Sequence, residues 1–231
     1  MVEPGRLIAQ GRSADVYECG AGRVLRRYRI EHESAEYEAR VMQHVRALGF
    51  PAPEVFDAAG PDLVMERVDG LTMLEALGKR PWTLASLADT LADLHQRLHA
   101  LPAPDWVPPE LGGGPALVHL DLHPLNVLMT PGGPVVIDWP NTRRAEAATD
   151  VAHSWIVLAS ASPERRYERV LAAAGRGLFL RRFLGHFDRA SLVDVMPAVA
   201  ARWLSDRNVA DRERQVTYRF LRGLGVSAET G

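Results

Sequence analysis

Short apolar runs separated by glycine fill the first third of the chain, whereas most of the remainder shows helical periodicity. The runs cover residues 7–9, 15–17 and 24–28, and the glycines between them are Gly11, Gly20 and Gly22. Runs of this length with glycine punctuation are typical of strands joined by tight turns. The sequence therefore predicts an antiparallel meander at the start of the chain.

One amphipathic helix is expected after this meander. Ala35, Ala39, Met42 and Val45 recur at helical spacing between residues 33 and 48, and Gly49 follows as a stop signal. Extended segments over residues 54–57 and 63–67 come next and end at a turn. We expect five strands and one helix to form an N-terminal lobe over residues 1–67.

The remaining residues, 68–231, are expected to form a mainly helical C-terminal lobe. Leucines recur every three or four residues between 83 and 101, which predicts a helix with one buried face. A segment rich in proline and glycine, 102–115, is predicted to be a loop. Runs at 126–129 and 134–137 predict a hairpin, and four or five helices are expected from residue 149 onward.

Composition narrows the class of protein. The 231 residues are 47% hydrophobic, which suffices for a buried core, and the net charge of −2 gives no reason to expect nucleic acid or a membrane surface as a partner. The first residues lack an apolar core, and no run approaches the roughly 18 to 20 apolar residues of a membrane span, so we expect a cytoplasmic protein. Cys19 is the one cysteine and Lys79 the one lysine, so arginine must do any chemistry that prefers lysine.

The segment of residues 118–129 is polar at its centre and bounded by apolar residues that would anchor it in the core. We expect its polar side chains to form the reactive site. Asp121 and Asn126 lie five residues apart, and Asp138 follows the predicted hairpin, which folds the chain back toward Asn126. Phosphoryl transfer needs a carboxylate to orient and deprotonate a hydroxyl, and oxygen ligands for the magnesium ion that bridges the phosphates. Asp121 suits the first role, and Asn126 and Asp138 suit the second.

The spacing His-x-Asp-x-x-x-x-Asn from His119, followed by Ile-Asp-Trp at 137–139, resembles the catalytic core of the aminoglycoside phosphotransferase and choline kinase family. That family is related to protein kinases, and Asp150-Val-Ala is similar to its Asp-Leu-Ala motif. The resemblance implies an α+β, two-lobed kinase-like fold with ATP and Mg²⁺ between the lobes. It implies that Asp121 is the general base, that Asn126 and Asp138 hold magnesium, and that His119 and Asp150 support the loop.

The same resemblance implies a nucleotide site in the N-terminal lobe. Glu38 corresponds to the helix glutamate that pairs with a strand cation, which is normally lysine and here is Arg26. Strand alternation puts Val24 and Arg26 on one face, so that Val24 covers adenine while Arg26 reaches phosphate. The remaining expected contacts are the backbone amides of Arg12, Ser13 and Ala14 at the phosphates, and the hinge-like residues Glu66 and Val68 at the adenine edge.

Other interpretations stay open. Asp121 and Asn126 are residue types that also favour turns and caps. A metal-dependent hydrolase would instead use His119, Asp121, His123 and Asp138 as ligands. His95 and His99, one helical turn apart, suit either a metal or surface and lobe-packing positions. Arginines near the C-terminus alternate with acids, which favours a solvated face over a nucleic-acid site.

The function expected from these residues is transfer of the γ-phosphoryl group of ATP to a hydroxyl of a small metabolite or antibiotic. Acceptor groups are expected on the helices of residues 154–224, where arginine outnumbers acid, which argues against a polycationic antibiotic. A protein substrate is not expected, because no Ala-Pro-Glu ending follows Asp138. The alternative is a weak or inactive nucleotide-binding module that acts through a partner, which the arginine at position 26 and the single glycine of the loop favour.

Overall fold

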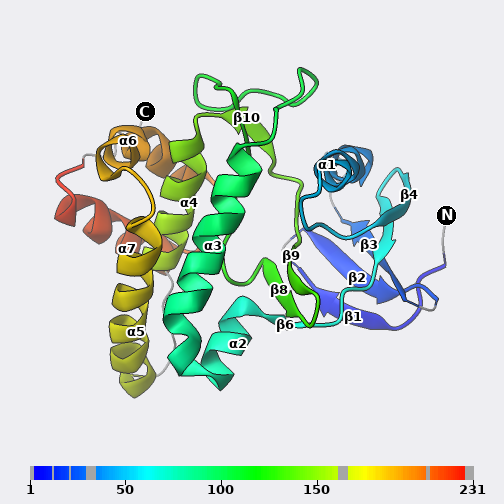
Figure 1. Ribbon diagram of the computed structural model, residues 1–231, viewed down its shortest axis with the longest axis horizontal. Helices are drawn as coiled ribbons and strands as arrows, with labels where there is room; N and C mark the ends of the chain where they lie inside the picture. The colour runs from blue at the N-terminus through cyan, green and yellow to red at the C-terminus, as the bar shows by residue number, and fades with distance from the viewer. Residues whose placement is uncertain are drawn as a thin grey trace. The chain divides into compact units, whose positions relative to one another are not determined.

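The structure, a computed structural model, describes residues 3–11, 13–20, 22–29, 35–160, 166–206 and 209–226, with residues 166–174 described by their backbone. The chain divides into two compact units (Figure 1). The first unit combines Met1–Met73 with Leu125–Thr142, and the second combines Leu74–Pro124 with Arg143–Gly231. The first unit is therefore built from two segments that are distant in the sequence.

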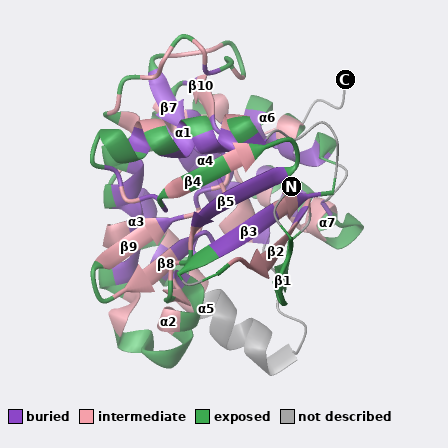
Figure 2. Ribbon diagram, turned by 90° about the vertical axis from the view of Figure 1, so that its right-hand side faces the viewer, coloured by how far each residue is buried: buried purple, intermediate pink, exposed green. Residues whose placement is uncertain are grey.

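A five-stranded antiparallel sheet forms the larger part of the first unit. Its order is β1-β2-β3-β5-β4, with β1 at Leu7–Gln10, β2 at Ala14–Glu18, β3 at Arg23–Tyr28, β4 at Val55–Ala59 and β5 at Asp62–Glu66. The strands β3 and β5 are mostly buried, as Figure 2 shows. Arg26 lies in β3 between Val16 of β2 and Leu63 of β5, so its backbone is held from both sides. The predicted antiparallel meander at the start of the chain and the five strands expected in the N-terminal lobe are confirmed.

The helix α1, Ala35–Ala47, packs against β4 and β5. Its buried face is Ala35, Glu38, Ala39, Val41, Met42 and Val45. It ends before Gly49, whose φ of 81° is a conformation that glycine adopts without a steric penalty. The predicted helix over 33–48 is confirmed over residues 35–47, and residues 33 and 34 lie outside the described part. Glu38 is the one ionisable side chain on this buried face.

A small sheet of order β6-β8-β9 completes the first unit, with β6 at Leu71–Thr72, β8 at Val127–Thr130 and β9 at Gly133–Val136. The β8–β9 pair is the hairpin that the sequence predicts. The Val136 N–H donates to the Pro51 carbonyl at 2.8 Å, and the Trp139 ring meets Phe50 edge-on at 5.6 Å. These long-range contacts attach the hairpin to the first unit. The two units therefore differ from the lobes expected from the sequence, which divide the chain once, after residue 67.

The second unit is mainly helical. Its elements are α2 (Met73–Lys79), a 3-10 turn (Pro81–Thr83), α3 (Leu84–His99), β7 (Ala116–Val118), β10 (Arg143–Ala145), α4 (Ala147–Ser160), α5 (Arg166–Leu184), α6 (Arg189–Ser205) and α7 (Asp211–Gly223). The predicted leucine stripe of α3 is buried at Leu87, Leu91, Leu94 and Leu98. Helix α4 packs against α3, α5, α6 and α7. It is thus the central helix of this unit.

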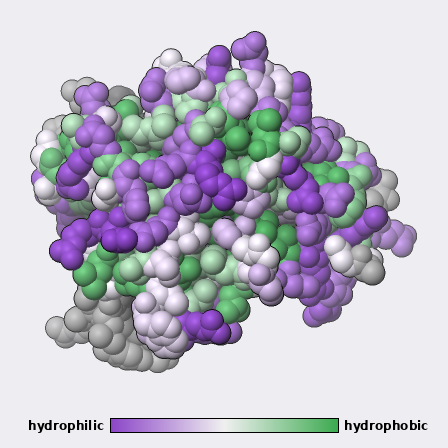
Figure 3. Space-filling model, in the orientation of Figure 1, coloured by the Kyte–Doolittle hydropathy of each residue, from purple (hydrophilic) through white to green (hydrophobic). Residues whose placement is uncertain are grey.

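Among the helices of the described residues, none combines the length and the apolar character that crossing a membrane requires. Hydrophilic and hydrophobic residues are intermixed on the face that Figure 3 displays.

Candidate active site

Arg26 lies between two carboxylates in the first unit. Its Nη2 donates to Asp138 Oδ1 at 2.6 Å, and its Nε lies 3.4 Å from Glu38 Oε2. We call Arg26, Glu38 and Asp138 the arginine–carboxylate cluster. Arg26 is 9% exposed, and burial alone would lower its pKa, but Glu38 and Asp138 outweigh burial and raise the pKa above its usual value. The guanidinium therefore stays charged.

Glu38 is fully buried and is held by donors from two other elements. The Trp139 N–H donates to Oε1 at 2.9 Å, and the Tyr28 hydroxyl donates to Oε2 at 2.5 Å. Burial raises the pKa of Glu38, and Arg26 opposes that rise. Burial also raises the pKa of Tyr28, so the phenol keeps its proton and acts as the donor. The sequence prediction missed Tyr28, although it lies two residues after Arg26 and hence on the same face of β3.

Asp138 and Asn126 both lie at the open end of the β8–β9 hairpin. The Ile137 N–H donates to the Asn126 carbonyl at 3.0 Å, which extends the ladder by one pair and brings Asp138 next to Asn126. The Asp138 side chain is 34% exposed, and its φ of 72° is the left-handed conformation, a form of backbone strain that clusters at functional sites. An amide oxygen and a carboxylate are the oxygen ligands that Mg²⁺ prefers, so this pair fits the predicted metal.

The predicted phosphate loop lies between β1 and β2. The Gly11 N–H donates to the Ala14 carbonyl at 2.8 Å, and the Arg29 N–H donates to the Ser13 carbonyl at 2.9 Å. A Cβ on Gly11 would lie 2.9 Å from the Ala14 oxygen, so this turn needs glycine. Arg12 lies outside the described residues. Phosphate contact by this loop stays a prediction.

The remaining predicted nucleotide residues lie on β3, on β5 and just after β5. Val24 is buried opposite Met65. Glu66 is tied to Glu54: its N–H donates to the Glu54 carbonyl at 2.8 Å, and its Oε2 accepts from the Glu54 N–H at 3.0 Å. Val68 is half-buried in the link that follows. Adenine contact by these residues stays a prediction.

In the second unit, the buried carboxylate of Asp150 holds the backbone just before Asp121. The N–H groups of His119 and Leu120 donate to it at 3.0 and 2.7 Å. Leu120 has a φ of 57°, and its side chain is anchored in an apolar cluster with Val118 and Ala145. The carboxylate thus satisfies two amides at a point where the chain adopts a strained conformation.

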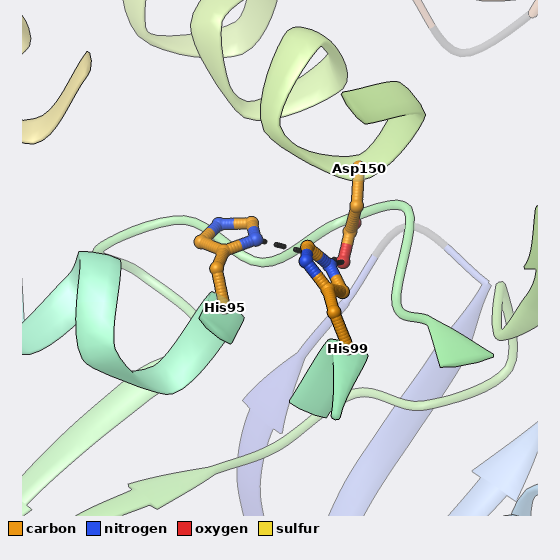
Figure 4. Close-up of side chains that lie close together, drawn as sticks. All are labelled: His95, His99 and Asp150. Carbon is orange, nitrogen blue, oxygen red and sulfur yellow. Dashed lines mark hydrogen bonds and ion pairs between the residues drawn. The ribbon is translucent and has the colours of Figure 1, made fainter. Parts of the chain in front are cut away.

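His95 and His99 project from α3 toward Asp150 of α4 (Figure 4). His99 Nε2 lies 3.0 Å and His95 Nδ1 lies 3.6 Å from Asp150 Oδ2. We call these three residues the aspartate–histidine cluster. Burial would raise the pKa of Asp150, but the two histidines hold it well below its usual range. Asp150 is therefore ionised, and it joins α3 and α4 to the loop that carries Asp121.

The structure corrects the expected surface placement of His95, which is fully buried, with Nε2 3.3 Å from the Leu122 carbonyl. Burial lowers the pKa of His95, so the ring is neutral. The ligand atoms of the aspartate–histidine cluster lie within 4.8 Å of one another, the one such group found among the described residues. Because N–H donors already occupy both Asp150 oxygens, a hydrogen-bond network accounts for the cluster without a metal. The alternative set of His119, Asp121 and His123 forms no such group in the described part of the second unit.

Asp121 is paired with His123, whose Nε2 lies 3.2 Å from Asp121 Oδ1. Burial would raise the pKa of Asp121, but the hydrogen bond from His123 and the nearby His153 lower it overall. Burial lowers the pKa of His153 to about 4, so this ring is neutral near pH 7. The sequence prediction included His123 solely as a possible metal ligand and missed His153. An ionised carboxylate with a quarter of its surface accessible can accept a hydrogen bond from a hydroxyl that reaches it.

The five-stranded sheet with its single helix and the helical unit around α4 define a kinase-like fold. The chain matches the Phosphotransferase enzyme family over residues 4–112 and 96–192, and it belongs to that family.

Solved structures share the fold. A choline/ethanolamine kinase family protein from Mesorhizobium loti is 18% identical, with a TM-score of 0.65 over 98% of this chain and 90% of that one. A thermostable mutant of aminoglycoside phosphotransferase APH(4)-Ia is 16% identical, with a TM-score of 0.66 over 96% and 95%. Amicoumacin kinase hAmiN is 15% identical, with a TM-score of 0.58 over 95% and 87%. A search of curated proteins found no match.

Proposed function

We propose that this phosphotransferase moves the γ-phosphoryl group of ATP to a hydroxyl of a small molecule. The observation that carries the proposal is the arginine–carboxylate cluster, which sets a permanent cation beside Asp138 at the hairpin end where Asn126 also lies. Phosphoryl transfer depends mostly on positioning and charge neutralisation, and these groups are of the types that supply both.

Each residue has a proposed role. Asp121 orients the acceptor hydroxyl and takes its proton, and Asn126 and Asp138 would hold Mg²⁺, which neutralises the charge that develops on the phosphates when it is bound. Glu38 keeps Arg26 in place for phosphate contact. His119 and Asp150 fix the backbone before Asp121, which the short amide–carboxylate bonds support. Such pre-set positions reduce the reorganisation that the reaction requires.

The nucleotide would lie against the sheet of the first unit. Backbone amides of Arg12, Ser13 and Ala14 would face the phosphates, Val24 would cover adenine, and Glu66 and Val68 would border its edge. The structure of amicoumacin kinase hAmiN in complex with AMP-PNP supports the use of a nucleoside triphosphate by this fold. Cytoplasmic location remains an expectation from the sequence.

The acceptor is proposed to be a small molecule bound by helices α4 to α7. Solved relatives include an aminoglycoside phosphotransferase in a ternary complex with streptomycin and ATP, which supports a small hydroxyl-bearing acceptor. The excess of arginine over acid in residues 154–224 argues against a polycationic acceptor here. Neither nucleic acid nor a membrane is proposed as a partner.

The test compares wild type with Asp121→Asn in magnesium-dependent ATP turnover against a panel of hydroxyl metabolites. Loss of a general base lowers turnover by about 10² to 10⁴-fold. ATP binding measured by calorimetry should be unchanged. Asp93→Asn, an exposed position on α3 of the same unit, is the matched control and should keep full turnover. Equal turnover in wild type and Asp121→Asn contradicts the assigned base.

One observation favours a second candidate, a nucleotide-binding module with weak or no turnover. Arg26 occupies the place where the family normally has lysine, and its guanidinium is engaged by Asp138. The two side chains are not interchangeable at a fitted site. ATP binding without turnover against any acceptor in the panel would support this candidate.

A further inference from the structure

The contact between Arg26 and Asp138 joins a side chain proposed for phosphate to one proposed for the metal. Asp138 Oδ1 accepts a 2.6 Å charge-assisted hydrogen bond from a cation that cannot lose its proton. Any divalent ion at Asp138 would share that carboxylate with the guanidinium. Cations that approach the same carboxylate repel each other, and partial burial weakens the screening of that repulsion by water.

The geometry lets Arg26 exchange one partner while it keeps the other. Its backbone is fixed in β3, and its Nε faces Glu38, which the Trp139 N–H and the Tyr28 hydroxyl hold in place. The bond to Asp138 uses Nη2, at the far end of the guanidinium. A rotation about the Cδ–Nε bond would therefore move Nη2 away from Asp138 while Nε stays near Glu38.

A nucleoside triphosphate offers the alternative partner. Phosphate oxygens accept bidentate hydrogen bonds from arginine, which are stronger than those of neutral groups. We propose that Arg26 makes metal binding at Asp138 depend on a bound nucleoside triphosphate, so that the nucleotide must engage Arg26 before a divalent ion gains Asp138. This inference rests on the proposed function. Linkage requires the reverse coupling as well: metal at Asp138 must strengthen the binding of the triphosphate.

The first measurement is a Mn²⁺ titration of the nucleotide-free protein, followed by electron paramagnetic resonance of free Mn²⁺. Wild type and Asp138→Asn should bind Mn²⁺ equally, because without nucleotide Arg26 keeps the ion away from Asp138. The double variant Arg26→Met with Glu38→Gln removes the cation together with its buried partner charge, and it should gain Mn²⁺ affinity by about tenfold or more. Adding Asp138→Asn to the double variant should abolish that gain. Arg26→Gln is the second variant if the double variant fails to fold.

The matched control is Arg27→Lys. Arg27 is the next residue of β3, on the opposite face, where it pairs with Asp62 through bonds of 2.6 and 2.7 Å. Its substitution should leave Mn²⁺ affinity as in wild type. The second measurement titrates AMP-PNP into wild type in the presence of EDTA, where the triphosphate should bind without any metal.

The outcomes separate the two ideas. The coupling is wrong if nucleotide-free wild type binds Mn²⁺ through Asp138 as tightly as the Arg26 variants do. That result leaves the proposed function intact. Folded Arg26 variants that gain no Mn²⁺ affinity also overturn it. Absence of AMP-PNP binding with and without metal overturns the proposed function, and the coupling with it.

Discussion

Glu38 and Asp150 are buried carboxylates, and each is satisfied by a combination of backbone amides and side chains. Glu38 accepts from Trp139 and Tyr28, and Asp150 accepts from His119, Leu120 and His99. A buried charge is tolerated when hydrogen bonds replace the water that it loses. The stability of the fold should therefore fall when one donor to either carboxylate is removed, even where that donor touches no substrate.

Tyr28→Phe tests this sensitivity in the first unit. The substitution removes the hydroxyl that donates to Glu38 and leaves a buried acceptor without one of its bonds. We expect unfolding free energy to fall by about 1 to 3 kcal/mol. Urea denaturation followed by circular dichroism measures the change, with Tyr218→Phe, an exposed tyrosine of α7, as control. Equal losses in both variants would contradict the importance of this bond.

Stability should also depend on pH through His153. An unfolded histidine has a pKa near about 6.5, whereas burial lowers the pKa of folded His153 to about 4. Between these values the unfolded chain binds a proton that the folded chain does not, so stability falls as pH falls from about 6.5 toward 4. The contribution reaches about 1.4 kcal/mol per pH unit.

Urea midpoints at pH 7, 6 and 5 measure this dependence. His153→Gln should flatten the slope relative to wild type because it removes the titrating ring. Parallel slopes for the two proteins would show that His153 does not titrate differently in the folded and unfolded states.

Individual site residues differ in how far the sequence could predict them. Asp121, Asn126 and Asp138 lie in a recognisable spacing, and the predicted hairpin pairs Asn126 with Ile137, the residue before Asp138. Their shared role at a metal stays a prediction. Tyr28 and His153 were missed because their significance comes from contacts with other site residues, Glu38 and Asp121, that form only when the chain packs. Packing decides which residues are buried and which groups they contact, and a local sequence pattern does not encode either.

At the level of strands and helices, β7 and β10 approach each other closely next to Gly114. A Cβ on Gly114 would lie 2.3 Å from the Ala145 carbonyl carbon and 2.4 Å from the Glu146 nitrogen, both of them backbone atoms that cannot move aside alone. Gly78, within α2, has nothing within 4 Å of an added Cβ. The two glycines therefore make a matched pair.

Gly114→Ala should destabilise the protein, and Gly78→Ala should stabilise it. We expect a loss of about 1 to 3 kcal/mol from the forced displacement at Gly114, and a gain of about 0.5 to 1 kcal/mol from the better helix propensity at Gly78. Thermal unfolding of the two variants beside wild type gives both values. If Gly114→Ala leaves the unfolding free energy unchanged, the β7–β10 pair can shift to accommodate the methyl group without an energetic penalty.

Element length decided which elements the sequence predicted. Helices α1 and α3 are long and have one apolar face, so their periodicity was readable. The strands β6, β7 and β10 have two or three residues each, too few for any alternation. Their pairing is set by partners elsewhere in the chain, which explains why they were missed.

Across the full chain, the first unit depends on a segment that the sequence assigns to the other lobe. Val136 and Trp139, from Leu125–Thr142, bond to the Pro51 carbonyl and the Glu38 carboxylate. Hydrophobic periodicity indicates local secondary structure. It does not show that a later segment of the chain packs against an earlier one. A division after residue 67 was therefore the simplest one that the sequence could support.

A fragment of residues 1–73 should consequently fail to fold on its own. Without Leu125–Thr142, Arg26 and Glu38 lose Asp138 and the Trp139 amide, and Phe50 loses the Trp139 ring. We expect no cooperative thermal transition by circular dichroism, whereas the full chain should show one. A sharp transition in the fragment would mean that the sheet and α1 suffice.

The left-handed backbone of Asp138 determines which substitution can isolate its chemistry. Asparagine tolerates a positive φ better than most residues, so Asp138→Asn removes the negative charge with little added strain. Alanine in the same place would add a conformational penalty of about 1 to 2 kcal/mol to the loss of the carboxylate. An alanine scan would thus confound misfolding with lost metal affinity at the position where that distinction matters most.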